Sequence, residues 1–337
     1  MIYGNIQGVG RSGANGRVSR LVLGTNTFSL DREEMAFSIL DAFVAAGGTT
    51  IDTAHIYRNG ESEQVIGKWL RARGNRDGLV LVTKGAHPKV DMRDPFASDW
   101  APRVTPAAIA EDLTESLESL GVGSIDLYLL HRDDPTQPVG PIMDALNAHL
   151  ASGRVHALGA SNWTHQRIAE ANDYAERHGL KGFVTSSPQL SLAVPLRGTM
   201  PGTLSISGDY AALDWYKHHA VSILAWSSQS GGFFASPLAP GSPDLSPRLR
   251  NYDRPENWER WRRVREASAR LGVTPTRVAL AWVLCQDFDT YAVIGVTQAA
   301  HLDDALGALD VGLSVDEVGW LDLRPTAVEI ERRRASA

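Results

Sequence analysis

Four ionisable side chains stand at or just beyond the ends of three successive predicted strands. Asp52 and Tyr57 follow the second strand of the chain, Lys84 ends the third, and His131 ends the fourth. In a parallel α/β barrel the carboxyl ends of the strands meet at one face, so these four groups are expected to converge there. Each of them alone has an ordinary structural explanation, but four at matching strand ends favour a reaction site.

The chemistry that suits these groups is proton transfer to a carbonyl oxygen. A phenol with a pKa near ~10 is a poor acid at neutral pH, and an ammonium such as Lys84 beside Tyr57 is expected to lower that pKa. Asp52 would hold Lys84 charged and in place, while His131 would orient the carbonyl oxygen. The set contains neither a nucleophile nor a metal site, so a bound cofactor must supply the reductant, and a hydride donor fits.

The elements that must position these groups alternate between short apolar runs and longer amphipathic stretches, which is typical of βα units. The runs are near-continuously apolar, as expected of strands buried on both faces. Eight strands are predicted, at Leu21–Gly24, Thr49–Asp52, Leu79–Lys84, Ile125–His131, Val155–Ser161, Phe183–Gln189, Val221–Ser227 and Tyr291–Gly295. Helices are predicted between them, including Asp31–Ala46, Glu61–Arg73, Pro106–Leu120, Pro138–Ala151 and Thr164–His178.

Eight such units in a chain of 337 residues predict one (β/α)₈ TIM barrel domain over residues 1–337, in preference to a doubly wound sheet. Residues 1–20 precede the first strand and are expected to form a short hairpin across the bottom of the barrel. Two connections are too long to be simple turns, Gly85–Val104 after the third strand and Ser230–Pro255 after the seventh, and we expect both to be functional.

Composition excludes several classes of protein. The chain has 33 Lys and Arg against 39 Asp and Glu, a formal net charge of −6, so it lacks the basic surface that nucleic acid requires. The single cysteine, Cys285, rules out a disulfide framework and a multi-cysteine zinc site. No run approaches the ~18 apolar residues of a membrane span, and the first residues do not resemble a secretory leader, so a cytoplasmic protein is expected.

The order and spacing of these residues resemble the aldo-keto reductase family over nearly the whole chain. The segment from Ile51 to Glu63 is similar to the stretch of that family around its catalytic aspartate and tyrosine, and the similarity continues through Val82–Lys84, Ile125–His131 and Gly159–Asn162. The resemblance implies a (β/α)₈ barrel that binds NAD(P)H across its carboxyl face. It also implies that Asp52, Tyr57, Lys84 and His131 are the catalytic residues, with Tyr57 the general acid.

The resemblance further implies which residues contact the cofactor. The family residues that bind the nicotinamide carboxamide correspond by resemblance to Ser161, Asn162 and Gln189. Trp226 resembles the aromatic residue whose ring packs on the nicotinamide. The full expected set is Gly24, Thr25, Asp52, Ser161, Asn162, Gln189, Trp226, Ser227, Ser228, Gln229, Gly231, Gly295, Thr297, Gln298, His301 and Asp304.

The last of these segments departs from the family pattern. Many relatives carry Arg or Lys near Thr297 and Gln298, where a 2′-phosphate would lie, and an amide is a weaker partner for a phosphate than a cation is. An arginine of the loop after the seventh strand, Arg248, Arg250 or Arg254, could supply the charge instead. NADP(H) is therefore expected with a small margin, and NAD(H) remains an alternative.

The substrate is expected to be a small carbonyl compound that is polar or sugar-like. The residues expected to contact it are Tyr57, Trp100, His131, Arg132 and Trp163, and charged residues of the long loops would line the rim. Two other functions remain open at this stage. One is a cofactor-binding regulatory subunit with little turnover, resembling channel β-subunits, and the other is a barrel hydrolase or lyase that uses no cofactor.

Overall fold

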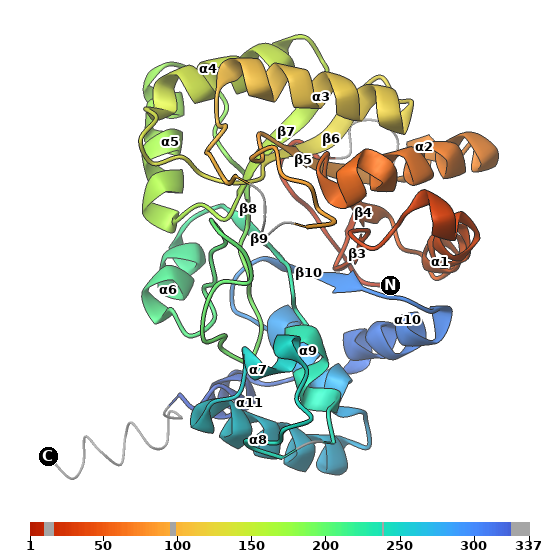
Figure 1. Ribbon diagram of the computed structural model, residues 1–337. Coiled ribbons are helices and arrows are strands. Elements are labelled where there is room, and N and C mark those ends of the chain that lie inside the picture. The colour runs from red at the N-terminus through yellow and green to blue at the C-terminus, as the bar shows by residue number, and fades with distance from the viewer. Residues whose placement is uncertain (10–16, 95–98, 238, 325–337) are drawn as a thin grey trace, which may run out of the picture.

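The computed structural model is a closed barrel of eight parallel strands surrounded by helices (Figure 1). It describes residues 1–9, 17–94, 99–237 and 239–324. The barrel strands are β3 (Leu21–Gly24), β4 (Thr50–Asp52), β5 (Val80–Gly85), β6 (Ile125–Leu130), β7 (Val155–Ser161), β8 (Thr185–Ser187), β9 (Ser222–Ala225) and β10 (Thr290–Gly295). The barrel closes where β10 pairs with β3, with Gly295 opposite Gly24. The predicted fold class is confirmed.

The helices are α1 (Glu33–Ala45), α2 (Glu61–Arg73), α3 (Pro106–Leu120), α4 (Val139–Ala151), α5 (His165–Arg177), α6 (Tyr210–His218), α7 (Pro247–Arg250), α8 (Pro255–Leu271), α9 (Pro275–Leu284), α10 (Ala299–Leu306) and α11 (Val315–Leu321). Helices α3, α4 and α5 lie on one side of the barrel, while α8, α9 and α11 group on the opposite side (Figure 1). The ends of α3 show why prediction succeeded there. Thr105 accepts a hydrogen bond from the amide of Ala108, and Gly121 ends the helix at φ 66°.

The bottom of the barrel is closed by the first residues of the chain, as expected. Strands β1 (Tyr3–Gly4) and β2 (Val18–Ser19) form an antiparallel pair outside the barrel. Ile6 and Val9, between them, are buried against apolar side chains of the barrel interior such as Val80 and Leu127. The rest of the core lies between the strands and the surrounding helices.

Three long connections lie on the carboxyl side of the strands, one more than the sequence predicts. Those after β5 and β9 were expected. The third joins β8 to α6 over residues 188–209, and the backbone of Gln189 forms isolated bridges with Ser205 in this connection and with Trp226 after β9. Strand β8 is shorter than the predicted Phe183–Gln189, because its regular pairing with β7 runs only from Thr185 to Ser187 and Gln189 forms isolated bridges alone.

Candidate active site

Lys84 is the centre of the group of residues predicted at the strand ends. Its ammonium donates to both carboxylate oxygens of Asp52, at 2.7 and 2.8 Å, and to the carbonyl of Thr53 at 2.8 Å. It also lies 3.3 Å from the hydroxyl of Tyr57. The side chains of Lys84 and Asp52 are only 3% and 4% exposed, so this ion pair is shielded from water.

The turn that carries Tyr57 follows β4 in an uncommon backbone conformation. Arg58, Asn59 and Gly60 all have positive φ, at 53°, 55° and 90°, although only glycine adopts this region without strain. The side chain of Asn59 compensates by bridging to the next loop. It donates to Asp91 at 2.8 Å and accepts from the amide of Met92 at 2.9 Å.

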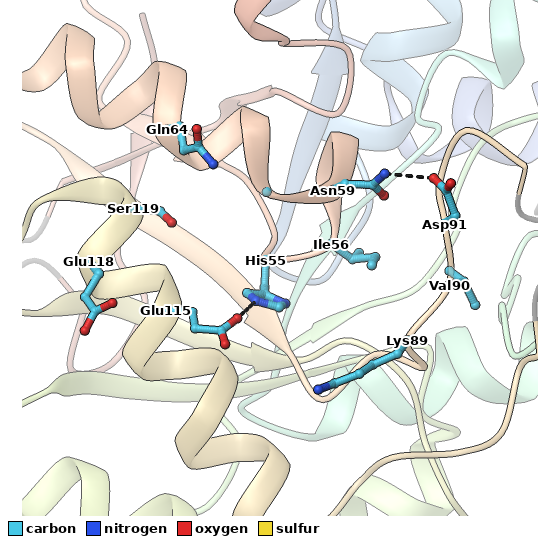
Figure 2. A pocket seen from close by; sticks show the side chains of 11 residues that line it. His55, Ile56, Asn59, Gln64, Lys89, Val90, Asp91, Glu115, Glu118 and Ser119 are labelled. Carbon is cyan, nitrogen blue, oxygen red and sulfur yellow. Dashed lines mark hydrogen bonds and ion pairs between the residues drawn. The ribbon is translucent and has the colours of Figure 1, made fainter.

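A cavity of about 630 Å³ lies beside this turn (Figure 2). His55, which contacts Glu115 at 2.6 Å, and Asn59 line it from the β4 side, and Lys89 lines it from the loop after β5. None of Asp52, Tyr57, Lys84 and His131 lines this cavity. It is therefore separate from the candidate active site.

His131 lies against Tyr57, as the strand-end argument predicts. The two rings meet edge to face with centroids 5.6 Å apart, and the ring of His87 lies 4.8 Å from that of His131. Trp100, from the same loop as His87, contacts His87 at 5.4 Å. Nδ1 of His131 is buried and has no hydrogen-bond partner among the described residues. The loop after β5 therefore contributes two rings to the mouth of the site.

Burial, together with the nearby charge of Arg132, keeps both histidines neutral. Burial, followed by the charge of Arg132, holds the pKa of His131 well below its ordinary 6.5. The same two causes lower the pKa of His87 to about 4. A neutral imidazole has one N–H to donate, so His131 can hydrogen-bond a carbonyl oxygen without adding a positive charge beside Lys84.

Two opposing effects set the pKa of Tyr57, burial and the charge of Lys84. Burial raises it above its ordinary 10.0, and the charge of Lys84 lowers it by less than burial raises it. Lys84 acts in the expected direction, but desolvation of the phenolate outweighs this one ammonium, so the pKa stays above its usual value. Burial also raises the pKa of Asp52 against the effect of Lys84. Burial acts to lower the pKa of Lys84, but Asp52 and Tyr57 hold it above its ordinary value.

Arg132 is a buried cation without an acidic partner. The residue is 7% exposed. Its guanidinium donates from Nη1 to the carbonyl of His131 at 2.8 Å and from Nε to that of Pro201 at 3.3 Å, and no carboxylate of the described residues pairs with it. Pro201 belongs to the connection after β8, which the sequence analysis missed. The spacing of Pro188, Pro195 and Pro201 with Gly198 and Gly202 was the available signal for a loop there.

The residues expected around a nicotinamide carboxamide meet at the ends of β7 and β8. Ser161 donates to the carbonyl of Ser187 at 2.8 Å, and the amide nitrogen of Asn162 donates to Ser161 and to the carbonyl of His131. Gln189 donates to the hydroxyl of Tyr252, but its Oε1 is buried with no partner among the described residues. An acceptor left open in this way fits a ligand that brings an N–H, such as a carboxamide.

Trp226 and the turn after β9 form the next part of the expected cofactor site. Trp226 is half-buried and its buried Nε1 has no partner among the described residues. Ser228 donates to the carbonyl of Val293, which ties this turn to β10. Ser227 and Gly231 have positive φ, at 52° and 64°. The expected Gln229 lies between them.

The three arginines considered for a 2′-phosphate differ in the structure. Arg250 donates to the carbonyls of Leu245 and Pro243, and Arg254 pairs with Glu256 at 3.0 Å. Arg248 is exposed and lies on the turn, because a Cβ on Gly231 would come within 2.6 Å of its Nε. Among the described residues no hydrogen-bond or ion-pair partner of Arg248 is found. Arg248 is therefore the arginine available to an anion.

The remaining expected cofactor residues lie at the ends of β3 and β10. Thr25 is buried, and its hydroxyl donates to the carbonyl of Asp52 at 3.0 Å. A Cβ on Gly24 would come within 2.9 Å of Val293, so glycine is needed at this end of β3. Gly295, Thr297, Gln298 and His301 are exposed, whereas Asp304 pairs with Arg277 at 3.1 Å.

One expected substrate residue is misplaced by the sequence analysis. Trp163 is fully buried, packs edge to face on Phe183, and donates its indole N–H to the carbonyl of Arg132 at 3.0 Å. Its ring therefore supports Arg132 from behind and offers no surface to a substrate. Trp100, in contrast, is half-buried beside His87 and remains a candidate.

The described residues contain no group of three or more His, Cys, Asp or Glu side chains that could hold a metal ion. Nor do they contain a helix long and apolar enough to cross a membrane.

The chain is similar to one protein family over most of its length. The model of the aldo/keto reductase family matches residues 20–323. Norsolorinic acid reductase B of Aspergillus parasiticus is 30% identical, and the match covers 91% of this chain and 80% of that protein. An uncharacterised oxidoreductase of Bacillus subtilis is 30% identical, and the match covers 93% of this chain and 94% of that protein. A putative aryl-alcohol dehydrogenase of Saccharomyces cerevisiae is 26% identical, and the match covers 91% of this chain and 83% of that protein.

A solved structure shares the fold at lower sequence identity. The crystal structure of a thermostable aldo-keto reductase in complex with the inhibitor epalrestat superposes with a TM-score of 0.70. It is 22% identical, and the match covers 96% of this chain and 99% of that one.

Proposed function

The chain belongs to the aldo/keto reductase family of oxidoreductases, and we propose that it reduces an aldehyde or ketone to the alcohol with NADPH, Tyr57 being the general acid. The observation that carries this proposal is the contact of the Lys84 ammonium with both Asp52 and the Tyr57 hydroxyl in one buried group. We also propose that the physiological substrate is small and polar or sugar-like, because His131 lies against the Tyr57 ring and the charge of Arg132 acts on Tyr57.

The residues present fit a nicotinamide cofactor. The open acceptor of Gln189 and the unpartnered Nε1 of Trp226 are buried polar atoms that the described residues leave unsatisfied. Ser161, Asn162 and Gln189 would hold the carboxamide, and the turn from Ser227 to Gly231 would cover the pyrophosphate. When bound, the cofactor supplies a hydride to the carbonyl carbon.

This chain's residues supply the proton and stabilise the charge on oxygen. Tyr57, held protonated by burial, donates its proton to the carbonyl oxygen as negative charge develops there. Lys84 lies against the phenol oxygen and stabilises the phenolate that remains, while Asp52 keeps Lys84 charged. The neutral ring of His131 donates a hydrogen bond to the same carbonyl oxygen and fixes its orientation.

Turnover of a small panel of carbonyl compounds tests the proposal. Loss of the reduced-nicotinamide absorbance with glyceraldehyde, a dicarbonyl sugar and an aryl aldehyde should show catalytic reduction by NADPH. The aryl aldehyde is included because two relatives are named for aromatic compounds, norsolorinic acid and aryl alcohols. If kcat/KM for the aryl aldehyde is about tenfold higher or more, the polar-substrate proposal is wrong. Binding of NADPH with no turnover of any compound would contradict the proposed activity.

The pKa directions predict how reduction depends on pH. Because the pKa of Tyr57 lies above 10.0, the general acid stays protonated through the neutral range. Because burial holds the pKa values of His131 and His87 below 6.5, neither of these two histidines changes its charge there. We expect kcat for reduction to be flat from about pH 6 to pH 9 and to fall only at higher pH. Oxidation of the alcohol needs the phenolate and should rise with pH over the same range. A titration near pH 6.5 in reduction would contradict the assignment of neutral His131.

The choice between the two nicotinamide cofactors is predicted to depend on Arg248. Arg248→Ala removes the available cation beside Gly231, so KM for NADPH should rise by about tenfold or more while that for NADH changes little. Gln298→Arg should tighten NADPH more than NADH, because it adds a cation to the exposed loop after β10. Arg254→Ala is the matched control, since that arginine already pairs with Glu256. Equal effects of Arg248→Ala on both cofactors would show that Arg248 does not face the 2′-position.

A further inference from the structure

The positive charge of Arg132 lies at the mouth of the site, and no acidic side chain of the described residues pairs with it. Arg132 directly follows His131 and is bound to the carbonyl of that residue, so its guanidinium is anchored beside the proposed hydrogen-bond donor. Its charge acts on the pKa values of Tyr57, His87 and His131, three groups that converge on the mouth. The cation is thus adjacent to the place where a carbonyl oxygen would bind.

The surroundings hold this guanidinium in place and leave part of it open. Pro201 accepts from Nε, and a Cβ on Gly202 would come within 3.1 Å of Cδ, so the connection after β8 lies across the stem of the side chain. Trp163 supports the backbone of Arg132 from behind. Nη2 donates no hydrogen bond to any described residue. A guanidinium bound only through Nε and Nη1 retains N–H groups for a further planar acceptor.

Burial of this kind is costly without a counter-ion. A cation removed from water loses its hydration, and an anion nearby offsets that cost. Burial accordingly lowers the pKa of Arg132 to about 10. The acidic groups nearby are already committed, because Asp52 pairs with Lys84 and Asp133 with Arg167. No acidic group of the described residues is left to pair with Arg132, so a bound ligand can be its partner.

We propose that Arg132 binds a carboxylate of the substrate, so that the preferred substrates are aldehydes or ketones that carry a carboxylate group. The inference rests on the proposed function and narrows its substrate class to oxo acids. A carboxylate suits the site because a single guanidinium offers two parallel N–H groups and one charge. A phosphate dianion would require a second cation, and Lys84 is saturated by Asp52, Thr53 and Tyr57.

The experiment compares substrates that differ only in this charge. With the purified protein and NADPH, kcat/KM is measured for para-formylbenzoate and its methyl ester, and for succinic semialdehyde and its methyl ester. We expect the acid to be preferred by about tenfold or more in both pairs. Turnover of both members with no preference for the acid overturns the carboxylate site alone, whereas failure of all four compounds contradicts the proposed function.

Variants of Arg132 assign the preference to this residue. Arg132→Met should bring the acid-to-ester ratio of kcat/KM close to one, and Arg132→Lys should leave an intermediate ratio because it keeps the charge but loses the paired N–H groups. The matched control is Arg197→Met, an exposed arginine of the same connection after β8, which should keep the wild-type ratio. An unchanged ratio in Arg132→Met overturns the proposal.

A second measurement covers the case in which Arg132→Met does not fold. Benzoate should inhibit the wild-type protein competitively against the ester, and benzamide, which has the same shape without the charge, should inhibit at least about tenfold more weakly. Equal inhibition by the two compounds overturns the proposal without any variant.

Discussion

Tyr57→Phe lowers kcat for carbonyl reduction by about 10²–10⁴-fold and leaves NADPH binding intact, because only the proton-donating oxygen is removed. The ring and its contact with His131 are retained, so the shape of the mouth does not change. The measurements are steady-state kinetics, and quenching of protein fluorescence by NADPH as the test of cofactor binding.

The control for this variant is a tyrosine of similar chemistry elsewhere on the protein. Tyr174 also donates its hydroxyl to a neighbour, Asp144, but lies on α5 outside the site. Tyr174→Phe should keep the wild-type kcat. If Tyr57→Phe retains more than about a tenth of kcat, a loss below about 1.4 kcal/mol, Tyr57 is not the general acid.

Lys84→Met is the second change with a large expected effect, and it acts on both chemistry and stability. Reduction should fall by about a hundredfold or more, because the phenolate left by proton transfer loses its neighbouring charge. Lys84 opposes the effect of burial on the pKa of Tyr57, so its removal raises that pKa further. The alkaline limb of residual reduction should therefore move to higher pH, and alcohol oxidation should fall even more than reduction does.

The same variant leaves Asp52 buried without its partner, which costs about 3–5 kcal/mol in comparable ion pairs. Thermal unfolding of Lys84→Met should show this loss, and adding Asp52→Asn should recover much of it without restoring reduction. Recovery of activity in the double variant would mean that Lys84 serves only to neutralise Asp52. Lys84 is also engaged as a charged ammonium by three residues, so borohydride should trap no substrate on it. Trapping would instead favour a lyase.

The four strand-end residues were predictable because they depend on local patterns. A βα repeat fixes which end of each strand faces the mouth, and the apolar runs of β4, β5 and β6 show where the strands end within a residue or two. Asp52, Lys84 and His131 follow directly from those ends. The helices α2 and α3 were predicted to the residue, because glycine ends both and Thr105 with Pro106 begins the second.

Other features depend on contacts between distant segments, which a single sequence does not encode locally. Trp163 directly follows the residues that end β7, so its position along the chain predicted a contact with the substrate. In the structure its ring packs on Phe183 and lies in the core instead. The pKa of Tyr57 depends on how completely the folded chain buries its hydroxyl. The choice of Arg248 over Arg250 and Arg254 depends on which carbonyls and carboxylates the folded loop brings to each side chain.

The way the first residues close the barrel has a consequence for how the protein is made. The ribosome delivers Ile6 and Val9 before any part of the barrel exists, yet the surface that covers them includes Tyr291 and Val293 of the last strand. During translation these two apolar side chains therefore stay exposed until nearly the whole chain has emerged, and their burial belongs among the last folding events. A fusion partner joined to Met1 would stand beside this late-forming surface. Yield and solubility should therefore respond more to the length of an amino-terminal linker than to any change on the surface of the mature barrel.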